Sequence, residues 1–387
     1  MNDVMNPTED LTARWQKVVR RRSFLRGLGV AGAGAAIPAG KLLAQNDNRL
    51  SKGDAALLQF ALLAETLEAD LWQQYNELGG AVDANDNPNV GNVPYINALS
   101  QIDGDMSQYI SDNTDDEISH REFLKAYLKQ KGVTPVDLSG FAHLKSVTAS
   151  GAKQVGRLTN LQTLSVDTSW YFRYRSTQNP DNGAHFPQLL SIQNLPAIPL
   201  KDSYSQSTIQ AIANIASIHF AFIEQGGSSL YPILALKASG LEVLRILLSI
   251  GGVEIDHFSL WHDKMGNTIQ PPLAPLNDQV AGGTGLIFPN FNDPANQQNN
   301  GLSFPDKQAG SQMFQVNLIL PEPCTFLSEL LPPCSIIRPT LSDNGGPMAT
   351  IKAFAADNLF AGQPPQFLEM LQDLAADAEA AQRQIDG

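Results

Sequence analysis

Two segments of the sequence carry a glutamate and a histidine three residues apart. The pairs are Glu117 with His120 and Glu254 with His257. Residues three apart lie on the same face of an α-helix, so each pair places a carboxylate beside an imidazole. Both pairs stand in apolar helical patterns, where an unpartnered Glu or His is unfavourable. We therefore interpret the four side chains as metal ligands.

The two other predicted helices supply further carboxylates. Glu224 follows the apolar stretch 218–223. Glu65 and Glu68 lie on nearly one face of the first predicted helix, over residues 54–78. A two-metal site in a helical bundle needs one carboxylate from each of these helices in addition to the two Glu-x-x-His pairs. The predicted ligands are Glu65, Glu117, His120, Glu224, Glu254 and His257, with Glu68 as the alternative to Glu65.

The electrostatics of this cluster favour bound metal. Four carboxylates brought together in a helical interior repel one another and lose their hydration, which raises their pKa values and destabilises the fold. Two divalent cations would cancel these charges. Carboxylate oxygens and imidazoles without a nearby cysteine favour iron or manganese, with zinc as a third option.

Apolar periodicity predicts the helices that position these residues. The connection 133–206 separates the second helix from the third, the Pro/Asn/Gly-rich stretch 266–347 is expected to be irregular or to form short strands, and residues 348–387 are expected to form a final helix. An all-α fold follows, with a four-helix bundle over residues 50–265 and an irregular C-terminal extension. The four predicted helices cover residues 54–78, 114–131, 207–225 and 241–265.

Two of these helix boundaries depend on local sequence signals. Thr114, followed three residues later by Glu117, has the pattern of a helix N-cap. Gly226 and Gly227 stand two and three residues after Glu224 and indicate either the end of the third helix or a place where close packing is needed.

Two segments resemble a known family. Residues 60–72, Phe-Ala-Leu-Leu-Ala-Glu-Thr-Leu-Glu-Ala-Asp-Leu-Trp, resemble the first helix of the ferritin-like family that includes desiccation-related proteins. Residues 116–120, Asp-Glu-Ile-Ser-His, resemble that family's second helix. The resemblance covers the four helices and implies a ferritin-like four-helix bundle with a long crossover. It also implies that Asp116 orients a histidine ligand.

The resemblance favours Glu65 over Glu68 as the ligand from the first helix. In many ferritin-like sites a tyrosine follows this glutamate by seven residues, whereas Trp72 stands there in this sequence. Tyr75 stands seven residues after Glu68, which keeps the alternative open.

The ligand set and the resemblance imply two functions of different kinds. One is a di-iron or di-manganese oxidoreductase, ferroxidase- or catalase-like, that handles oxygen, peroxide or metal ions in stress protection. The alternative is a non-enzymatic desiccation- or stress-related structural protein in which the metal only stabilises the bundle. No catalytic residue is assigned. A homo-oligomer is compatible with either function, and iron storage would require a hollow multi-subunit shell.

The N-terminal segment has the layout of an export signal. The sequence 21–26, Arg-Arg-Ser-Phe-Leu-Arg, resembles the twin-arginine motif and precedes a weakly apolar run, 27–39. That run is too short for a membrane span, which needs about 20 residues. We predict a signal peptide over residues 1–44, recognition by the twin-arginine translocation machinery, and a periplasmic or extracellular protein.

The composition excludes one class of partner and allows one disulfide. The formal net charge is −13, and nucleic-acid binding requires basic patches, so a nucleic-acid partner is excluded. The two cysteines, Cys324 and Cys334, would form a loop disulfide in an oxidising compartment or remain as buried thiols.

Overall fold

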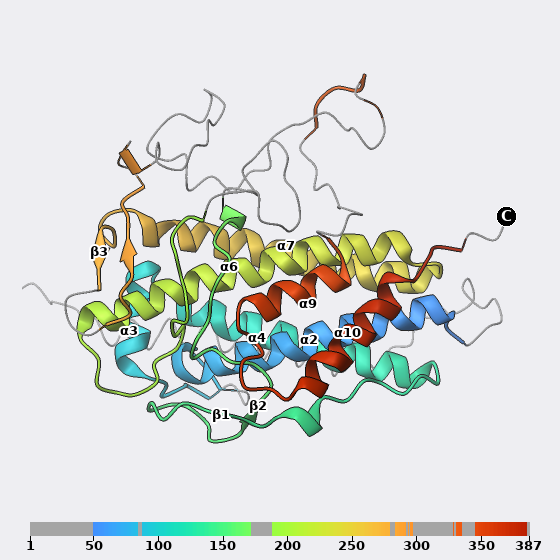
Figure 1. Ribbon diagram of the computed structural model, residues 1–387, viewed down its shortest axis with the longest axis horizontal. Helices are drawn as coiled ribbons and strands as arrows, with labels where there is room; N and C mark the ends of the chain where they lie inside the picture. Colours follow the sequence, from blue (N-terminus) through green and yellow to red (C-terminus); the bar gives the residue numbers. More distant parts are fainter. Residues whose placement is uncertain are drawn as a thin grey trace, which may run out of the picture. The chain divides into compact units, whose positions relative to one another are not determined.

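The structure is a computed structural model that describes part of the unit Arg49–Gly387. The described residues are 49–83, 87–171, 188–278, 283–291, 293, 295–296, 328, 330–334 and 345–384. They are mainly helical (Figure 1). The α-helices are α2 (Lys52–Gly79), α3 (Val93–Ile102), α4 (Met106–Gln130), α6 (Gln206–Lys237), α7 (Leu241–Gly266), α9 (Pro347–Ala356) and α10 (Pro365–Glu379). The short elements are the 3-10 helices η1 (Ser139–Phe141) and η2 (Asn267–Ile269) and the strands β1 (Leu144–Lys145), β2 (Gly156–Arg157), β3 (Leu276–Asn277) and β4 (Ile287–Phe288).

The four long helices pack as two pairs. Helix α2 lies along α4, and α6 lies along α7 after a turn of only three residues, 238–240 (Figure 1). Contacts of α2 with α6 and of α4 with α7 join the pairs. A long connection between α4 and α6 contains η1 and the antiparallel pair β1–β2. None of the described helices combines the length and the hydropathy of a membrane span.

Helix capping and one buried carboxylate hold the pairs in register. Ser51 caps α2 by accepting a hydrogen bond from the backbone N–H of Asp54, at 3.0 Å. The buried Asp54 carboxylate accepts hydrogen bonds from the backbone N–H groups of Ser239 and Gly240, at 2.9 Å each. The first turn of α2 is thus tied to the turn between α6 and α7.

The second predicted helix begins earlier than expected. Helix α4 starts at Met106, so the prediction that Thr114 caps it is wrong. Thr114 lies inside the helix, where its hydroxyl is 2.6 Å from the carbonyl oxygen of Ile110 and 3.2 Å from that of Trp72 on α2. Ser111 is also accommodated, because its hydroxyl donates to the side chain of Asn76 at 2.8 Å. Tertiary partners for these polar residues outweigh their low helix propensity.

The third predicted helix ends later than expected. Helix α6 continues past Gly226 and Gly227 to Lys237, so of the two alternatives for these glycines the one in which they end the helix is wrong. The additional turns bury Leu230, Tyr231 and Leu234 against the core. This apolar burial offsets the low helix propensity of two glycines.

The single helix predicted for residues 348–387 is two helices. Helix α9 ends at Ala356, and Asn358 and Gly362 then adopt positive φ angles of 61° and 91°. Pro364 and Pro365 follow, and a proline fits the first turn of a new helix but not the middle of one. Helix α10 packs on α2 and α9 packs on α6 (Figure 1).

Some predictions concern residues outside the described part of the chain. These are the signal peptide 1–44, most of the segment 297–344, and Cys324. In the described part of the predicted irregular extension, β3 pairs with β4 in a short antiparallel hairpin.

Candidate metal centre

The four long helices bring the six predicted ligands together. Helix α2 provides Glu65, α4 provides the pair Glu117 and His120, α6 provides Glu224, and α7 provides Glu254 and His257. All four carboxylates are fully buried, and each histidine is 8% exposed. The ligand atoms of the six residues form two overlapping groups in which all atoms lie within 4.8 Å of one another, and either group could hold a metal ion.

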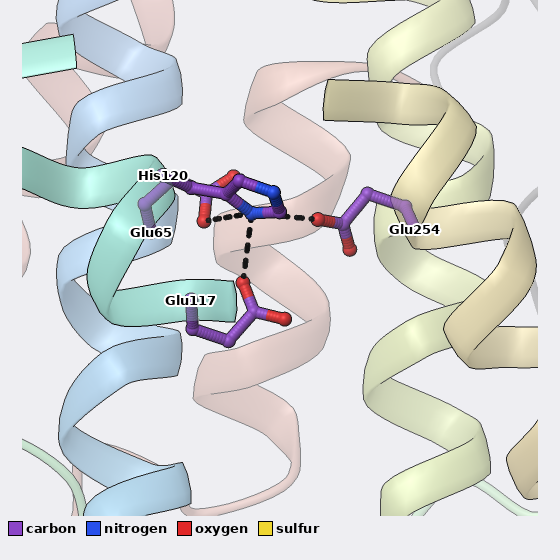
Figure 2. Close-up of side chains that lie close together, drawn as sticks. All are labelled: Glu65, Glu117, His120 and Glu254. Carbon is purple, nitrogen blue, oxygen red and sulfur yellow. Dashed lines mark hydrogen bonds and ion pairs between the residues drawn. The ribbon is translucent and has the colours of Figure 1, made fainter. Parts of the chain in front are cut away.

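The first group, called here the Glu65 group, surrounds one imidazole nitrogen. It contains Glu65, Glu117, His120 and Glu254. The Nδ1 atom of His120 lies 3.3 Å from Glu65 Oε2, 3.4 Å from Glu117 Oε2 and 3.5 Å from Glu254 Oε1. Figure 2 shows the three carboxylates converging on this nitrogen from α2, α4 and α7.

The second group, called the Glu224 group, contains Glu117, Glu224, Glu254 and His257. The Nδ1 atom of His257 lies 3.1 Å from Glu117 Oε1 and 3.3 Å from Glu224 Oε2. Glu117 and Glu254 belong to both groups. A carboxylate that belongs to two adjacent groups is placed between two possible metal positions, as in two-metal sites of helical bundles.

The donor atoms fit divalent cations. Five buried atoms of the ligands have no hydrogen-bond partner in the described part of the protein. They are Oε2 of Glu65, Oε2 of Glu224, both carboxylate oxygens of Glu254 and Nδ1 of His257. A buried polar atom without a partner is unfavourable, and bound ions would satisfy these atoms.

The charges of the metal-free cluster compete with one another. Burial and the charge of Glu117 raise the pKa of Glu65 to about 7, and burial raises the pKa of Glu254 well above its usual value. Burial also opposes ionisation of Glu117, but contacts with both histidines lower its pKa to about 2. For His120 burial is outweighed by Glu117 and Glu65, which raise the pKa to about 10. The metal-free cluster therefore holds protons at neutral pH.

The two remaining predicted residues lie beside the groups. Asp116 accepts at Oδ2 from Nε2 of His257 at 3.1 Å, which is the histidine-orienting contact that was expected of it. Glu68 is buried and its pKa is raised by burial and by the charges of Glu117 and Glu65, but it belongs to neither group.

Sequence reasoning missed two side chains that anchor Glu65 and Glu224, the carboxylates that each belong to one group only. The amide of Asn113 donates to Glu117 Oε1 at 2.8 Å and to Glu224 Oε1 at 3.0 Å. The hydroxyl of Tyr231 donates to Glu65 Oε1. Tyr231 stands seven residues after Glu224, so a search for this spacing on the third helix, and not only on the first, would have found it.

Aromatic rings pack beside the centre. Trp261 donates from Nε1 to Oδ1 of Asn113 at 2.6 Å and stacks on Trp72, with ring centroids 5.3 Å apart. Phe220 lies 4.8 Å from Trp72 and 4.7 Å from Trp261, between centroids. Aromatic contacts of this kind contribute about 0.5–1.5 kcal/mol per pair beyond their burial. Trp72, which replaces the tyrosine seen in related sites, is thus a core residue.

His219 of α6 lies outside both groups and is fully buried. Its Nδ1 is 2.8 Å from the hydroxyl of Tyr75. Burial lowers the pKa of His219 to about 3. The folded protein therefore keeps this imidazole neutral at pH values where the unfolded chain, with a histidine pKa of about 6.5, binds a proton. This difference reduces the free energy of unfolding as the pH falls from about 6.5 to about 3.

We expect His219→Gln to remove this pH dependence. Relative to wild type, the variant should become more stable by about 1.4 kcal/mol for each pH unit below about 6.5, or roughly 3 kcal/mol by pH 4. Urea unfolding of both proteins at about pH 7, 5.5 and 4 measures this difference. A difference that does not change with pH would contradict the assignment of a neutral, buried His219.

Comparison with family models supports the ferritin-like fold. The model of a family described as a ferritin-like domain matches residues 53–267, which is more than half of the chain and includes all six predicted ligands. Comparison with curated proteins gave no match, and comparison with solved structures gave none. The chain therefore belongs to the ferritin-like domain family.

Proposed function

We propose that this protein is an exported di-metal carboxylate protein that handles oxygen, peroxide or iron redox in stress protection. The observation that carries the proposal is the sharing of Glu117 and Glu254 between two groups of four ligands. We further propose that the four long helices form a ferritin-like four-helix bundle with the α4–α6 connection as its long crossover.

Each side chain has a defined part in this proposal. Glu117 and Glu254 would help to hold both ions, and Glu65 and Glu224 would each help to hold one, with an oxygen that has no hydrogen bond in the described part of the protein. His120 and His257 would each help to hold one ion with Nδ1, the nitrogen that faces the carboxylates. Hard oxygen donors with two imidazoles favour iron or manganese, with zinc as a third option. When bound, redox-active ions would supply the electrons for reduction of oxygen or peroxide.

Metal-loaded protein tests the redox function. We expect the iron- or manganese-loaded chain to consume peroxide or to oxidise Fe(II) with multiple turnovers, measured by an oxygen electrode and by absorbance. The same protein stripped of metal by a chelator is the control. Protein with two bound ions per chain and no turnover of either substrate would contradict the redox function.

The alternative is a structural role for the metal, and the burial of the ligands favours it. Glu65, Glu224 and Glu254 are fully buried, so the cluster offers little open surface to a substrate. In this case chelation would lower the free energy of unfolding by about 4 kcal/mol at a metal concentration of about 1,000 times Kd, without any turnover. Thermal unfolding with and without chelator measures this loss, and turnover by the loaded protein would contradict the structural role.

The proposed export depends on the arginine pair at the N-terminus. The motif 21–26 supports passage through the twin-arginine machinery to the periplasm or beyond. We expect replacement of Arg21 and Arg22 by lysine to leave the protein in the cytoplasm, as cell fractionation with an immunoblot would show. Unchanged export of this variant would contradict the assignment.

A further inference from the structure

We infer that the two metal positions are inequivalent and that the Glu224 group binds the first and tighter divalent cation. The inference rests on the proposed metal site and adds the order of filling and the residues that set it. It follows from a comparison of the side chains that support each group.

The ligands themselves are equivalent in pairs. Glu65 of α2 corresponds to Glu224 of α6, and the Glu-x-x-His pair of α4 corresponds to that of α7. Any difference in affinity between the groups must therefore come from the surrounding residues. Positions at the same spacing from corresponding ligands can be compared directly.

The carboxylates of Glu65 and Glu224 are anchored alike. One oxygen of Glu65 accepts from the Tyr231 hydroxyl, and one oxygen of Glu224 accepts from the Asn113 amide at 3.0 Å. In both residues the other oxygen, Oε2, has no hydrogen bond in the described part of the protein. Glu65 and Glu224 would thus each present one oxygen to an ion.

Asn113 does more for its group than Tyr231 does for the other. Its amide donates to Glu117 as well as to Glu224, and its own oxygen is fixed by Trp261 at 2.6 Å. Glu117 belongs to both groups, but Asn113 links it to Glu224, so two ligands of the Glu224 group are held together before a cation enters. The corresponding position on α7, four residues before Glu254, is Ile250, which has no hydrogen-bonding side chain. Preorganised ligands bind more tightly because less conformational freedom is lost on binding.

The histidines differ in the same direction. His257 contacts the Asp116 carboxylate through Nε2 at 3.1 Å, leaving Nδ1 facing the ligands. A carboxylate on the outer nitrogen fixes the orientation of a ligating imidazole, makes it more basic and adds negative charge near the cation. The corresponding position on α7, one residue before Glu254, is Val253, which has no carboxylate to offer His120. Both differences favour the first cation in the Glu224 group.

Isothermal titration calorimetry of the metal-free protein with Co²⁺ tests the order in which the two groups fill. We expect two binding steps, the first at least about tenfold tighter than the second. Asp116→Asn should weaken the first step by about 10–100-fold, the usual effect of losing such a partner, and leave the second within about threefold. The matched control, Tyr231→Phe, should weaken the second step and leave the first.

A second pair of variants gives the same information by deletion. His120→Ala should keep a single ion at the affinity of the wild-type first step, whereas His257→Ala should lose that step. Circular dichroism of each variant verifies the fold. Two equal steps in the wild type, or a tighter step that Asp116→Asn leaves unchanged, would overturn the inference. Absence of any saturable Co²⁺ binding by the wild type would instead overturn the proposed metal site.

Discussion

Glu254→Gln is expected to abolish the binding of both metal ions. Glu254 belongs to both ligand groups, and neither of its oxygens has a hydrogen-bond partner in the described part of the protein. Loss of partners that only orient a ligand lowers metal affinity 10–100-fold, so loss of a shared ligand should lower the affinity of both ions by more than about 100-fold. Calorimetric titration with Co²⁺ measures this loss.

The same substitution should not destabilise the metal-free protein. Burial and the neighbouring carboxylates of Glu117 and Glu68 raise the pKa of Glu254 well above its usual value. At neutral pH the unfolded chain ionises this glutamate, whereas the folded metal-free protein disfavours its ionised form, so Glu254 lowers the free energy of unfolding of the metal-free protein and a neutral glutamine removes this effect. A residue with only a structural role would give the opposite result, a loss of stability whether or not metal is present.

Glu68→Gln is the matched control for this experiment. Glu68 is also buried beside the cluster, but it lies in neither ligand group. We expect this variant to bind two ions. Loss of both ions from Glu68→Gln, or retention of both by Glu254→Gln, would contradict the assigned ligands.

Gly227→Ala is expected to disrupt the centre from outside the ligand set. A methyl group at this position of α6 would overlap Oε2 of Glu254 and lie 3.1 Å from its Cδ. Because Glu254 is packed on all sides, the carboxylate must move away from both ligand groups. We expect weaker binding of both ions by about tenfold or more. Overpacking costs about 1–3 kcal/mol, partly offset by roughly 1 kcal/mol of helix propensity.

Gly226→Ala provides a neighbouring control on the same helix. A methyl group at Gly226 would meet no atom within 4 Å. This variant should bind two ions normally and gain up to about 1 kcal/mol in stability from helix propensity. Parallel thermal unfolding and metal titration of the two variants measure both effects. Equal metal binding by Gly227→Ala and Gly226→Ala would show that Gly227 does not provide space for the ligand.

The sequence predicted the long helices well where apolar periodicity is strong. Helix α7 was expected over residues 241–265 and is observed over Leu241–Gly266. Predictions based on local signals were wrong at Thr114 and at Gly226–Gly227, because buried contacts between helices outweigh the conformational preference of single residues. Helix α3 was missed because Asn, Gly and Pro surround its start, where Asn92 caps it and Pro94 fits its first turn.

The spacing of Glu and His along two helices predicted the two Glu-x-x-His pairs of the candidate centre, because residues three apart share a face. Spacing on one helix does not tell which residue on another helix lies opposite. The preference for Glu65 over Glu68 came from the family resemblance and not from spacing, and the structure brings Glu65 into a ligand group. The anchoring role of Asn113 depends on a contact between helices far apart in the chain and could not be predicted from spacing within one helix. For Tyr231, by contrast, the sequence carries a signal, the spacing of seven residues from Glu224.

Metal analysis of the protein purified from its native compartment tests the central claim most directly. Inductively coupled plasma mass spectrometry against protein concentration from amino-acid analysis gives the number of ions per chain. Two ligand groups that share Glu117 and Glu254 predict about two ions per chain, with iron or manganese favoured. Fewer than one metal ion per chain would contradict the claim that this ferritin-like domain holds a two-metal centre.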